Sequence, residues 1–290
     1  MRHSIISTTR RRGAHMAPRR RVMPFTWLTA LLVLVGTCVM LYPPAASWYA
    51  AVEQHRESQH YVDSVQDLGA EARAASLAEA HQYNDSLADG NYIVDPFAAI
   101  EGTTVKSSDP YWSLMDPAGD GLMARLIIPS LNANLPIYHG TGSDVLLHGV
   151  GHLQGTALPV GGNGTHTVLT GHRGLPQATL FDNLDDLKPG DPIEINALGE
   201  LAVYRVINSA VVLPSETESL HSQSGSDLLT LVTCTPVGIN SHRILVTAER
   251  VAPSPEQTET PVDAVGFPYW ALILGTITAL DVIYVARSRR

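Results

Sequence analysis

Cysteine is scarce in this 290-residue chain, which contains only Cys38 and Cys234. Cys38 lies within a long apolar run, so Cys234 has no obvious disulfide partner, and a disulfide-stapled fold is excluded. Two interpretations of Cys234 remain open. It is either a reactive thiol or a buried structural cysteine, which behaves as a small hydrophobic residue.

Positive charge is scarce in the middle of the chain. Residues 53–263 contain nine Lys or Arg against 27 Asp or Glu. A nucleic-acid-binding protein needs basic patches that meet phosphates, so this composition excludes nucleic acid as a partner.

The sequence also lacks internal repeats, a phosphate-cradling glycine loop and a cluster with metal-ligand spacing. His148 and His152 are four residues apart, but Gly149 and Gly151 argue against the helix that would bring the two imidazoles together. We therefore expect neither a metal nor another cofactor.

Two long apolar runs are present, and the first covers residues 22–52, which carry no charge. Its core is long enough to cross a hydrocarbon layer of about 30 Å, which predicts a transmembrane helix over residues 22–45. A cleavable signal peptide is the alternative, because Ala45, Ala46 and Ser47 offer a cleavage site. The apolar region of a signal peptide has only about 7 to 15 residues, so the longer run favours an uncleaved anchor.

The second apolar run predicts a transmembrane helix over residues 264–286. Asp281 is costly in lipid, but a position near the end of the helix lets its carboxylate reach the interface. A buried C-terminal helix is the alternative. Seven arginines precede the first run and three follow the second, so the positive-inside rule places both termini in the cytoplasm and the acidic middle outside.

The segment after the first run is rich in Ala, Glu and Gln, which predicts one or two helices over residues 53–88 with a break near Gly69. Four of its residues share one helical face and predict a buried stripe: Tyr61, Val65, Leu68 and Ala72. Residues 89–121 show no apolar period and predict a long loop, a feature that is often functional.

Short apolar runs separated by Gly and Pro occupy the rest of the middle of the chain, which is typical of a mainly β, closed barrel or sandwich. The predicted strands are residues 122–128, 135–138, 145–147, 165–170, 192–195, 201–212, 228–233 and 243–250. The last two runs are separated by Pro236, Gly238 and Asn240. Cys234 and Arg243 are therefore expected at the facing ends of two strands joined by a loop.

A histidine follows one of these strands. Gly171 and Gly174 flank His172, which predicts an imidazole at a strand end or in a loop. A cysteine nucleophile needs a partner that transfers protons, and histidine is the usual one. The chain contains 12 histidines, however, so spacing alone does not single out His172.

Several motifs together resemble one family. TLVTC, which ends at Cys234, TGHRG around His172, and Arg243 resemble the sortase family of cysteine transpeptidases. TCTPVGINSHR and YHGTGSDVLLHGVGHLQGTALPVGG resemble its class C, pilin-polymerising branch. The resemblance runs from about residue 126 to residue 250. It implies an eight-stranded closed β-barrel, with Cys234 as nucleophile, His172 as catalytic histidine and Arg243 as catalytic arginine.

The resemblance also implies a reaction and its partners. An enzyme of this branch at the plasma membrane of a Gram-positive bacterium cleaves an LPXTG-like sorting signal between Thr and Gly and forms a thioester. It then transfers the acyl group to a lysine amine of a pilin subunit during pilus assembly. One alternative is attachment of single surface proteins to a cell-wall precursor. Another, from a different class, is a non-catalytic membrane scaffold or an adhesin-like domain.

Asp95, Pro96 and Phe97 resemble the Asp-Pro-aromatic motif of the class C lid. The resemblance implies that they lie over the active site when no substrate is bound. We expect Asp95 to pair with Arg243, since a carboxylate and a guanidinium make a strong charge-assisted contact. We also expect the Phe97 ring to contact the sulfur of Cys234.

These observations predict eight consecutive regions. They are a basic cytoplasmic N-terminus (1–21), a transmembrane helix (22–45), an extracytoplasmic helical region (46–88), a loop with the lid motif (89–121), the catalytic barrel (122–252), a linker (253–263), a second transmembrane helix (264–286) and a basic cytoplasmic tail (287–290).

Overall fold

A computed structural model gives the fold of the chain. It describes residues 24–87, 93, 95–97, 109–175, 180–252, 258–262 and 265–288. These residues form two compact units, one within residues 43–268 and one that combines residues 24–42 with residues 269–288. Helix α1 (Pro24–Asp67) begins in the second of these units and ends in the first.

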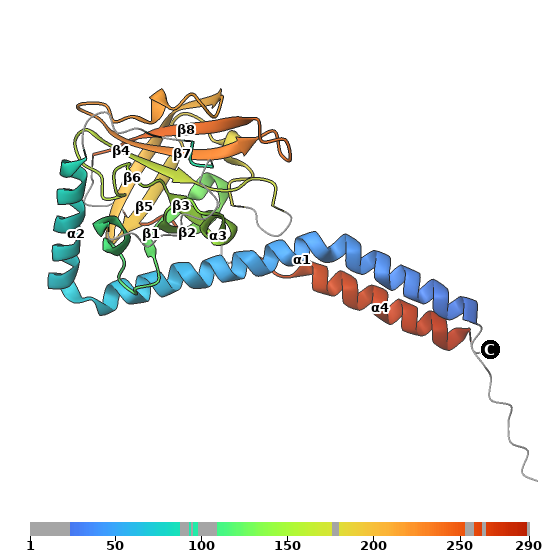
Figure 1. Cartoon of the computed structure of the whole chain (residues 1–290). Coiled ribbons are helices and arrows are strands. Elements are labelled where there is room, and N and C mark those ends of the chain that lie inside the picture. The colour runs from blue at the N-terminus through green and yellow to red at the C-terminus, as the bar shows by residue number, and fades with distance from the viewer. Residues whose placement is uncertain are drawn as a thin grey trace, which may run out of the picture. The chain divides into compact units, whose positions relative to one another are not determined.

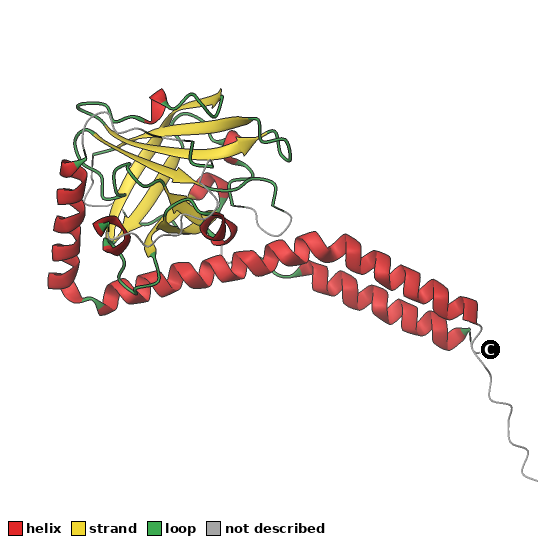
Figure 2. Cartoon of the chain, in the orientation of Figure 1, coloured by secondary structure: helices red, strands yellow, loops and turns green. Residues whose placement is uncertain are grey.

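The larger unit is built on a closed barrel of eight strands, as the sequence predicts (Figures 1 and 2). The strands are β1 (Leu122–Ile128), β2 (Ala133–His139), β3 (Val150–His152), β4 (Thr165–Thr170), β5 (Pro192–Ala197), β6 (Glu200–Val212), β7 (Asp227–Thr235) and β8 (His242–Arg250). They pair in the ring order β1-β2-β3-β4-β7-β8-β6-β5. The β2–β3 and β4–β7 pairs are parallel, and the other pairs are antiparallel.

Short helices precede the first strand or connect the strands. They are η1 (Pro110–Ser113), η2 (Pro129–Leu131), α3 (Ser143–His148), η3 (Leu184–Asp186) and η4 (Glu218–Leu220).

The predicted strand at residues 145–147 is wrong, because these residues lie in α3 and the third strand is β3. Three apolar residues are too few to separate a strand from a helical turn by periodicity. In α3 only Leu146 is buried while Leu147 is 45% exposed, so the turn buries one face. The true strand reads Val-Gly-His and carries almost no apolar signal.

Helices α1 and α2 (Gly69–Ser86) cover part of the barrel (Figure 1). Tyr61 of α1 is buried, and its hydroxyl donates to the Met123 carbonyl (3.0 Å) and accepts from the Leu198 amide (2.7 Å). Val65, one turn later, is also buried, and Leu68 packs against the core, so these three members of the predicted stripe face the barrel. Ala72 lies in the next helix, is only partly buried and does not belong to the core cluster. The chain breaks between the helices at Gly69, whose φ of +73° suits glycine.

Helix α2 packs Ala80 into the core, and a second buried side chain, that of Asn84, bonds to the barrel unit. The amide of Asn84 donates to the Leu158 carbonyl (3.1 Å), and its oxygen accepts from the Leu158 amide (2.7 Å). Asn84 thus pairs with the backbone of residue 158 as a neighbouring strand would.

The segment after β8 lies against the outer face of β1 and β5. Residues 258–262 are held through Glu194, which accepts from the Thr260 amide (2.9 Å) and hydroxyl. Glu259 forms an ion pair with Arg125, whose side chain is buried. Buried charges need partners of this kind, so the segment satisfies groups that the barrel alone would leave unpaired.

The smaller unit contains helix α4 (Tyr269–Arg287) and the apolar beginning of α1, which the sequence predicts as membrane spans. Helix α4 and the 43-residue stretch Phe25–Asp67 of α1 are each long and apolar enough to cross a membrane. Helix α4 begins five residues later than the predicted start at residue 264, because Pro268 disfavours helical geometry in the residue before it. The first predicted span and the helix after it form one continuous helix through Pro43 and Pro44.

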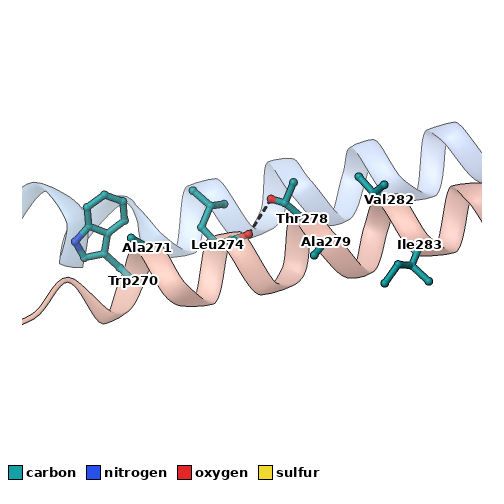
Figure 3. A pocket seen from close by; sticks show the side chains of 8 residues that line it. Trp270, Ala271, Leu274, Thr278, Ala279, Val282 and Ile283 are labelled. Carbon is teal, nitrogen blue, oxygen red and sulfur yellow. Dashed lines mark hydrogen bonds between the residues drawn. The ribbon is translucent and has the colours of Figure 1, made fainter.

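A shallow pocket runs along the surface of α4 (Figure 3). Its lining residues all belong to this helix and none is ionisable: Trp270, Ala271, Leu274, Gly275, Thr278, Ala279, Val282 and Ile283. The Thr278 hydroxyl donates to the Leu274 carbonyl of its own helix (2.8 Å). This pocket therefore offers no acid, base or nucleophile for chemistry.

A buried histidine joins η1 to the barrel. His152 of β3 is fully buried, and its Nε2 lies 2.9 Å from the Ala157 carbonyl while its Nδ1 lies 3.0 Å from the Tyr111 hydroxyl. A neutral ring that donates from Nε2 and accepts at Nδ1 satisfies both contacts. Burial, chiefly, lowers the pKa of His152 to about 4; the nearby His139 also lowers it, and the Ala157 carbonyl opposes them.

This histidine makes the stability of the fold depend on pH. The unfolded chain takes up a proton on residue 152 near pH 6.5, whereas the folded chain does so only near pH 4. The free energy of unfolding should therefore fall by about 3 kcal/mol as pH falls through this window. Urea unfolding of the detergent-solubilised chain between pH 7 and pH 4 measures it.

The contribution of this residue is isolated by substitution. His152→Gln should flatten the pH dependence, while His148→Gln, at an exposed position, should leave it unchanged. An equally steep dependence in His152→Gln and the unchanged chain contradicts this assignment.

Candidate active site

Two strands bring the predicted nucleophile and the predicted arginine together. β7 runs antiparallel to β8, and Cys234 lies directly opposite Arg243 in this pair. The register confirms that these residues end facing strands. The Cys234 thiol is free, and it is buried.

His172 reaches the same edge through β4, which is parallel to β7. Thr170 is the partner of Val232, and the Gly171 amide extends the ladder by donating to the Val232 carbonyl (3.1 Å). Parallel strands end at the same edge of a sheet. His172 therefore follows β4 close to the place where Cys234 lies on β7.

The alternation of side chains decides which face of the sheet carries the site. Along β7, Leu229 and Leu231 belong to the main core, whereas Val232 belongs to a second apolar cluster. Cys234 is two residues from Val232 and points to the same face, and so does Arg243 as its antiparallel partner. The candidate site thus lies on the outside of the barrel.

Arg243 is fixed by hydrogen bonds at all three guanidinium nitrogens. Nε and Nη2 donate to the two carboxylate oxygens of Asp95 (2.8 and 2.6 Å), and Nη1 donates to the carbonyls of Asn240 (2.9 Å) and His242 (3.1 Å). The Arg243 and Asp95 side chains are only 10% and 11% exposed. Burial alone would lower the pKa of Arg243, but the bonds and charge of Asp95 and the charge on Cys234 raise it.

Phe97 lies over the same residues. Its ring centroid is 5.7 Å from that of the His172 imidazole, and the guanidinium carbon of Arg243 is 5.1 Å from the centroid of the Phe97 ring. Contact with the Cys234 sulfur was the expectation, and the contacts found are with these two partners. We call Asp95, Pro96 and Phe97 the lid segment, because it covers the site.

An apolar surface lies under the lid segment. Phe97 and Ile93 pack against the second cluster, which consists of Leu153, Val168, Leu220, Val232 and Leu245. The sequence analysis did not identify this surface. The period-two alternation along β4, β7 and β8 carries the signal, because residues 168, 232 and 245 fall out of step with the main-core residues 169, 231 and 246.

The covered site favours uncharged side chains at the predicted nucleophile and base. Burial raises the pKa of Cys234, the charge of Arg243 opposes this, and the carboxylate of Asp95 raises it further. Burial lowers the pKa of His172. Both shifts disfavour the charged forms of Cys234 and His172 under the lid segment.

The arrangement has the parts needed for acyl transfer by a thiol. A thiol such as that of Cys234 can serve as a nucleophile, an imidazole such as that of His172 can carry protons, and Arg243 offers a fixed positive charge with planar donors. Among the residues that the structure describes, no group of three or more His, Cys, Asp or Glu side chains is placed to hold a metal ion.

The chain is similar in sequence and in fold to known proteins. Residues 126–251 match the family model described as Sortase domain. The chain is similar to the crystal structure of sortase C-1 from Actinomyces oris, with 49% identity, a TM-score of 0.59, and 63% of this chain and 100% of that chain covered. It is also similar to sortase C1 of the group B Streptococcus pilus island 1, with 37% identity, a TM-score of 0.64, and 72% and 97% covered.

A third similar protein is matched over less of its own length. Sortase D of Bacillus subtilis (strain 168) is 35% identical over 130 residues, which span 43% of this chain and 62% of that protein.

The contacts of the lid segment generate a test. Replacing Asp95 and Phe97 together by Ala removes the bidentate pair and the ring contacts, so a small thiol reagent should modify Cys234 about tenfold faster or more. Loss of the Asp95 charge and of burial both lower the pKa of Cys234, so the rate profile should also shift to lower pH. Stopped-flow modification across pH measures both effects.

A matched control removes a different Asp–Arg pair. Asp185→Ala breaks the contact of Asp185 with Arg173 (2.9 Å) outside the lid segment, and it should leave the modification rate unchanged. Equal rates in the unchanged chain and the Asp95/Phe97 double variant contradict a covering role.

Proposed function

Because this chain belongs to the sortase family, a family of cysteine transpeptidases, we propose that it joins pilin subunits at the cell surface. It cleaves an LPXTG-like sorting signal between Thr and Gly and transfers the new acyl group to a lysine amine of another subunit. The observation that carries the proposal is the direct pairing of Cys234 with Arg243 beside His172, under a lid segment held by that same arginine.

The first half-reaction forms a thioester. The thiol proton of Cys234 passes to His172, and the sulfur attacks the threonine carbonyl carbon, whose oxygen takes up negative charge. The C–N bond to glycine then breaks, and His172 gives a proton to the departing amine. The acyl group remains on the sulfur.

Arg243 stabilises the charge that develops in this step. In the covered site its Nε and Nη2 both bond to Asp95. When the lid segment leaves, these donors become available to the carbonyl oxygen of the signal. A guanidinium stays charged at every relevant pH, so it needs no proton transfer to do this.

The second half-reaction restores the enzyme. A lysine amine attacks the thioester carbonyl, the C–S bond breaks, and His172 takes the proton that the amine loses. An isopeptide bond joins the two subunits, and the thiolate of Cys234 is released. Water in place of the amine gives hydrolysis.

Opening of the lid segment also activates the thiol. The Asp95 carboxylate raises the pKa of Cys234 and the Arg243 charge lowers it, after the larger effect of burial. Departure of Asp95 removes one raising effect and leaves Arg243 unpaired beside the sulfur. The thiolate is thus favoured when a peptide enters, which limits side reactions in its absence.

The first test uses the nucleophile. Cys234→Ala should form no acyl-enzyme with a sorting-signal peptide, as read by intact mass. Cys38→Ala, which removes the other thiol from an exposed position on α1, should form it at the normal rate. An acyl-enzyme in Cys234→Ala contradicts the mechanism.

The other two site residues are tested in the same assay. His172→Ala and Arg243→Ala should each lose most turnover, and neither should add to the loss in Cys234→Ala, since these residues act as a unit.

The same assay also tests the acceptor. A lysine-bearing pilin domain should consume the acyl-enzyme faster than a cell-wall precursor amine. The opposite preference identifies attachment of single surface proteins as the function instead.

We further propose that both apolar helices anchor the enzyme in the plasma membrane with both termini in the cytoplasm. The 19-residue α4 and the apolar part of α1 are long enough, and the arginines at each end favour the inner side. This orientation places the barrel outside the cell, where surface proteins are assembled.

Protease accessibility tests the orientation. In intact cells freed of wall, a tag at either terminus should be protected while residues 109–262 are digested. A mature protein that begins after Ala46 or Ser47 contradicts the N-terminal anchor.

A further inference from the structure

The ends of β4 and β7 are joined by two hydrogen bonds just before His172 and Cys234. The Gly171 amide donates to the Val232 carbonyl (3.1 Å), and the Thr233 hydroxyl donates to the Gly171 carbonyl (2.8 Å). Gly171 and Thr233 therefore hold the two strands together, and each lies one residue before a side chain that takes part in the proposed chemistry.

The second of these bonds lies beyond the regular ladder. β4 ends at Thr170, so the carbonyl of Gly171 belongs to the segment that leads away from the sheet. The Thr233 side chain reaches over from β7 to hold it. Without this donor, only the amide of Gly171 ties the approach to His172 to the strand that carries Cys234.

Packing leaves Gly171 little freedom on its other side. A Cβ at this position would lie 2.7 Å from the ring of Phe181, and the Phe181 amide donates to the His172 carbonyl (3.1 Å). The peptide before His172 is therefore held between a ring on one side and the Thr233 hydroxyl on the other.

The hydroxyl of Thr233 is present in apolar surroundings. Thr233 is fully buried, and its partner across the β7–β8 pair, Ile244, belongs to the main core. Valine has nearly the same shape and would fill this place without a polar atom. A buried hydroxyl is unfavourable unless it is bonded, so its role is the bond to Gly171.

We propose that Thr233 is a positioning residue, whose hydroxyl fixes the imidazole of His172 relative to the sulfur of Cys234. The proposal rests on the acyl transfer proposed above. A transfer between two side chains depends steeply on their geometry, and a displacement of about 1 Å can cost about a hundredfold in rate. The side chain of Thr233 lies on the inward face of β7, opposite to the face that carries Cys234.

The chain offers a matched control for the loss of a buried threonine bond. Thr167 of β4 is also fully buried, and its hydroxyl donates to the Leu158 carbonyl (3.4 Å), away from His172. Thr167→Val removes the same type of bond from the neighbouring strand. It measures what such a loss does through stability alone.

The experiment compares Thr233→Val, Thr233→Ser and Thr167→Val in the full-length chain in detergent. Acyl-enzyme formation with a sorting-signal peptide gives a rate at saturation and a KM, and thermal unfolding gives Tm. Thr233→Val should lower the saturating rate at least about tenfold with KM changed less than about twofold. Thr233→Ser keeps the donor and should stay within about threefold of the unchanged chain. Thr167→Val should lower Tm but keep the rate.

Three results overturn the proposal. They are a Thr233→Val rate equal to that of Thr167→Val, a loss that appears only in KM, and a Thr233→Ser rate as low as that of Thr233→Val. If Thr233→Val does not fold, Thr233→Ala replaces it with the same expected rate loss. Failure of the proposed function is distinct, because the unchanged chain would then form no acyl-enzyme.

Discussion

The parallel pairing of β4 with β7 is the constraint on which the candidate site depends. Sequential hairpins would place the ends of neighbouring strands at opposite edges, whereas a parallel pair places them at the same edge. β4 and β7 are far apart in the sequence, with β5 and β6 between them. The barrel therefore brings His172 and Cys234 together through chain topology, and the β7–β8 hairpin adds Arg243.

One guanidinium connects the covered and the open forms of this site. Arg243 donates to Asp95 from Nε and Nη2, and in the proposed reaction the lid segment and a substrate carbonyl compete for these donors. The pair is nearly buried, and breaking it leaves two charges that need new partners. In the proposed reaction, a peptide whose carbonyl oxygen bonds to Arg243 lowers the free energy needed to separate Arg243 from Asp95.

Strands with strong apolar runs could be predicted from the sequence, and strands without them could not. Residues 122–128 match β1 because every side chain there is buried, on one face by the barrel core and on the other by neighbouring elements such as Tyr61. β3 was not predicted, because three residues of sequence Val-Gly-His show no apolar period. Its pairing with β2 and β4 defines it as a strand. The start of α4 depended on a single proline at residue 268.

Some features of the candidate site could likewise be predicted from the sequence, and others could not. The facing positions of Cys234 and Arg243 followed from two runs and the breakers between them. The contact of Asp95 with Arg243 spans 148 residues and has no local pattern, so only the resemblance to the sortase family suggested it. The apolar surface under the lid segment was readable from strand alternation once the partners of each strand were known. The bond from the Thr233 hydroxyl to the Gly171 carbonyl could be identified only from atomic positions.

Two of the attachments between the barrel and the rest of the chain share one feature. Tyr61 of α1 bonds to Met123 on β1 and to Leu198 beside β5, and residues 258–262 bond to Arg125 and Glu194 on these same two strands. In the ring order, β1 and β5 lie opposite β7 and β4. In the proposed reaction a surface fibre is held on Cys234, so a pull on it enters the barrel at β7. The force passes around the ring in both directions before it reaches β1 and β5, so the hydrogen bonds between all the strands share the load.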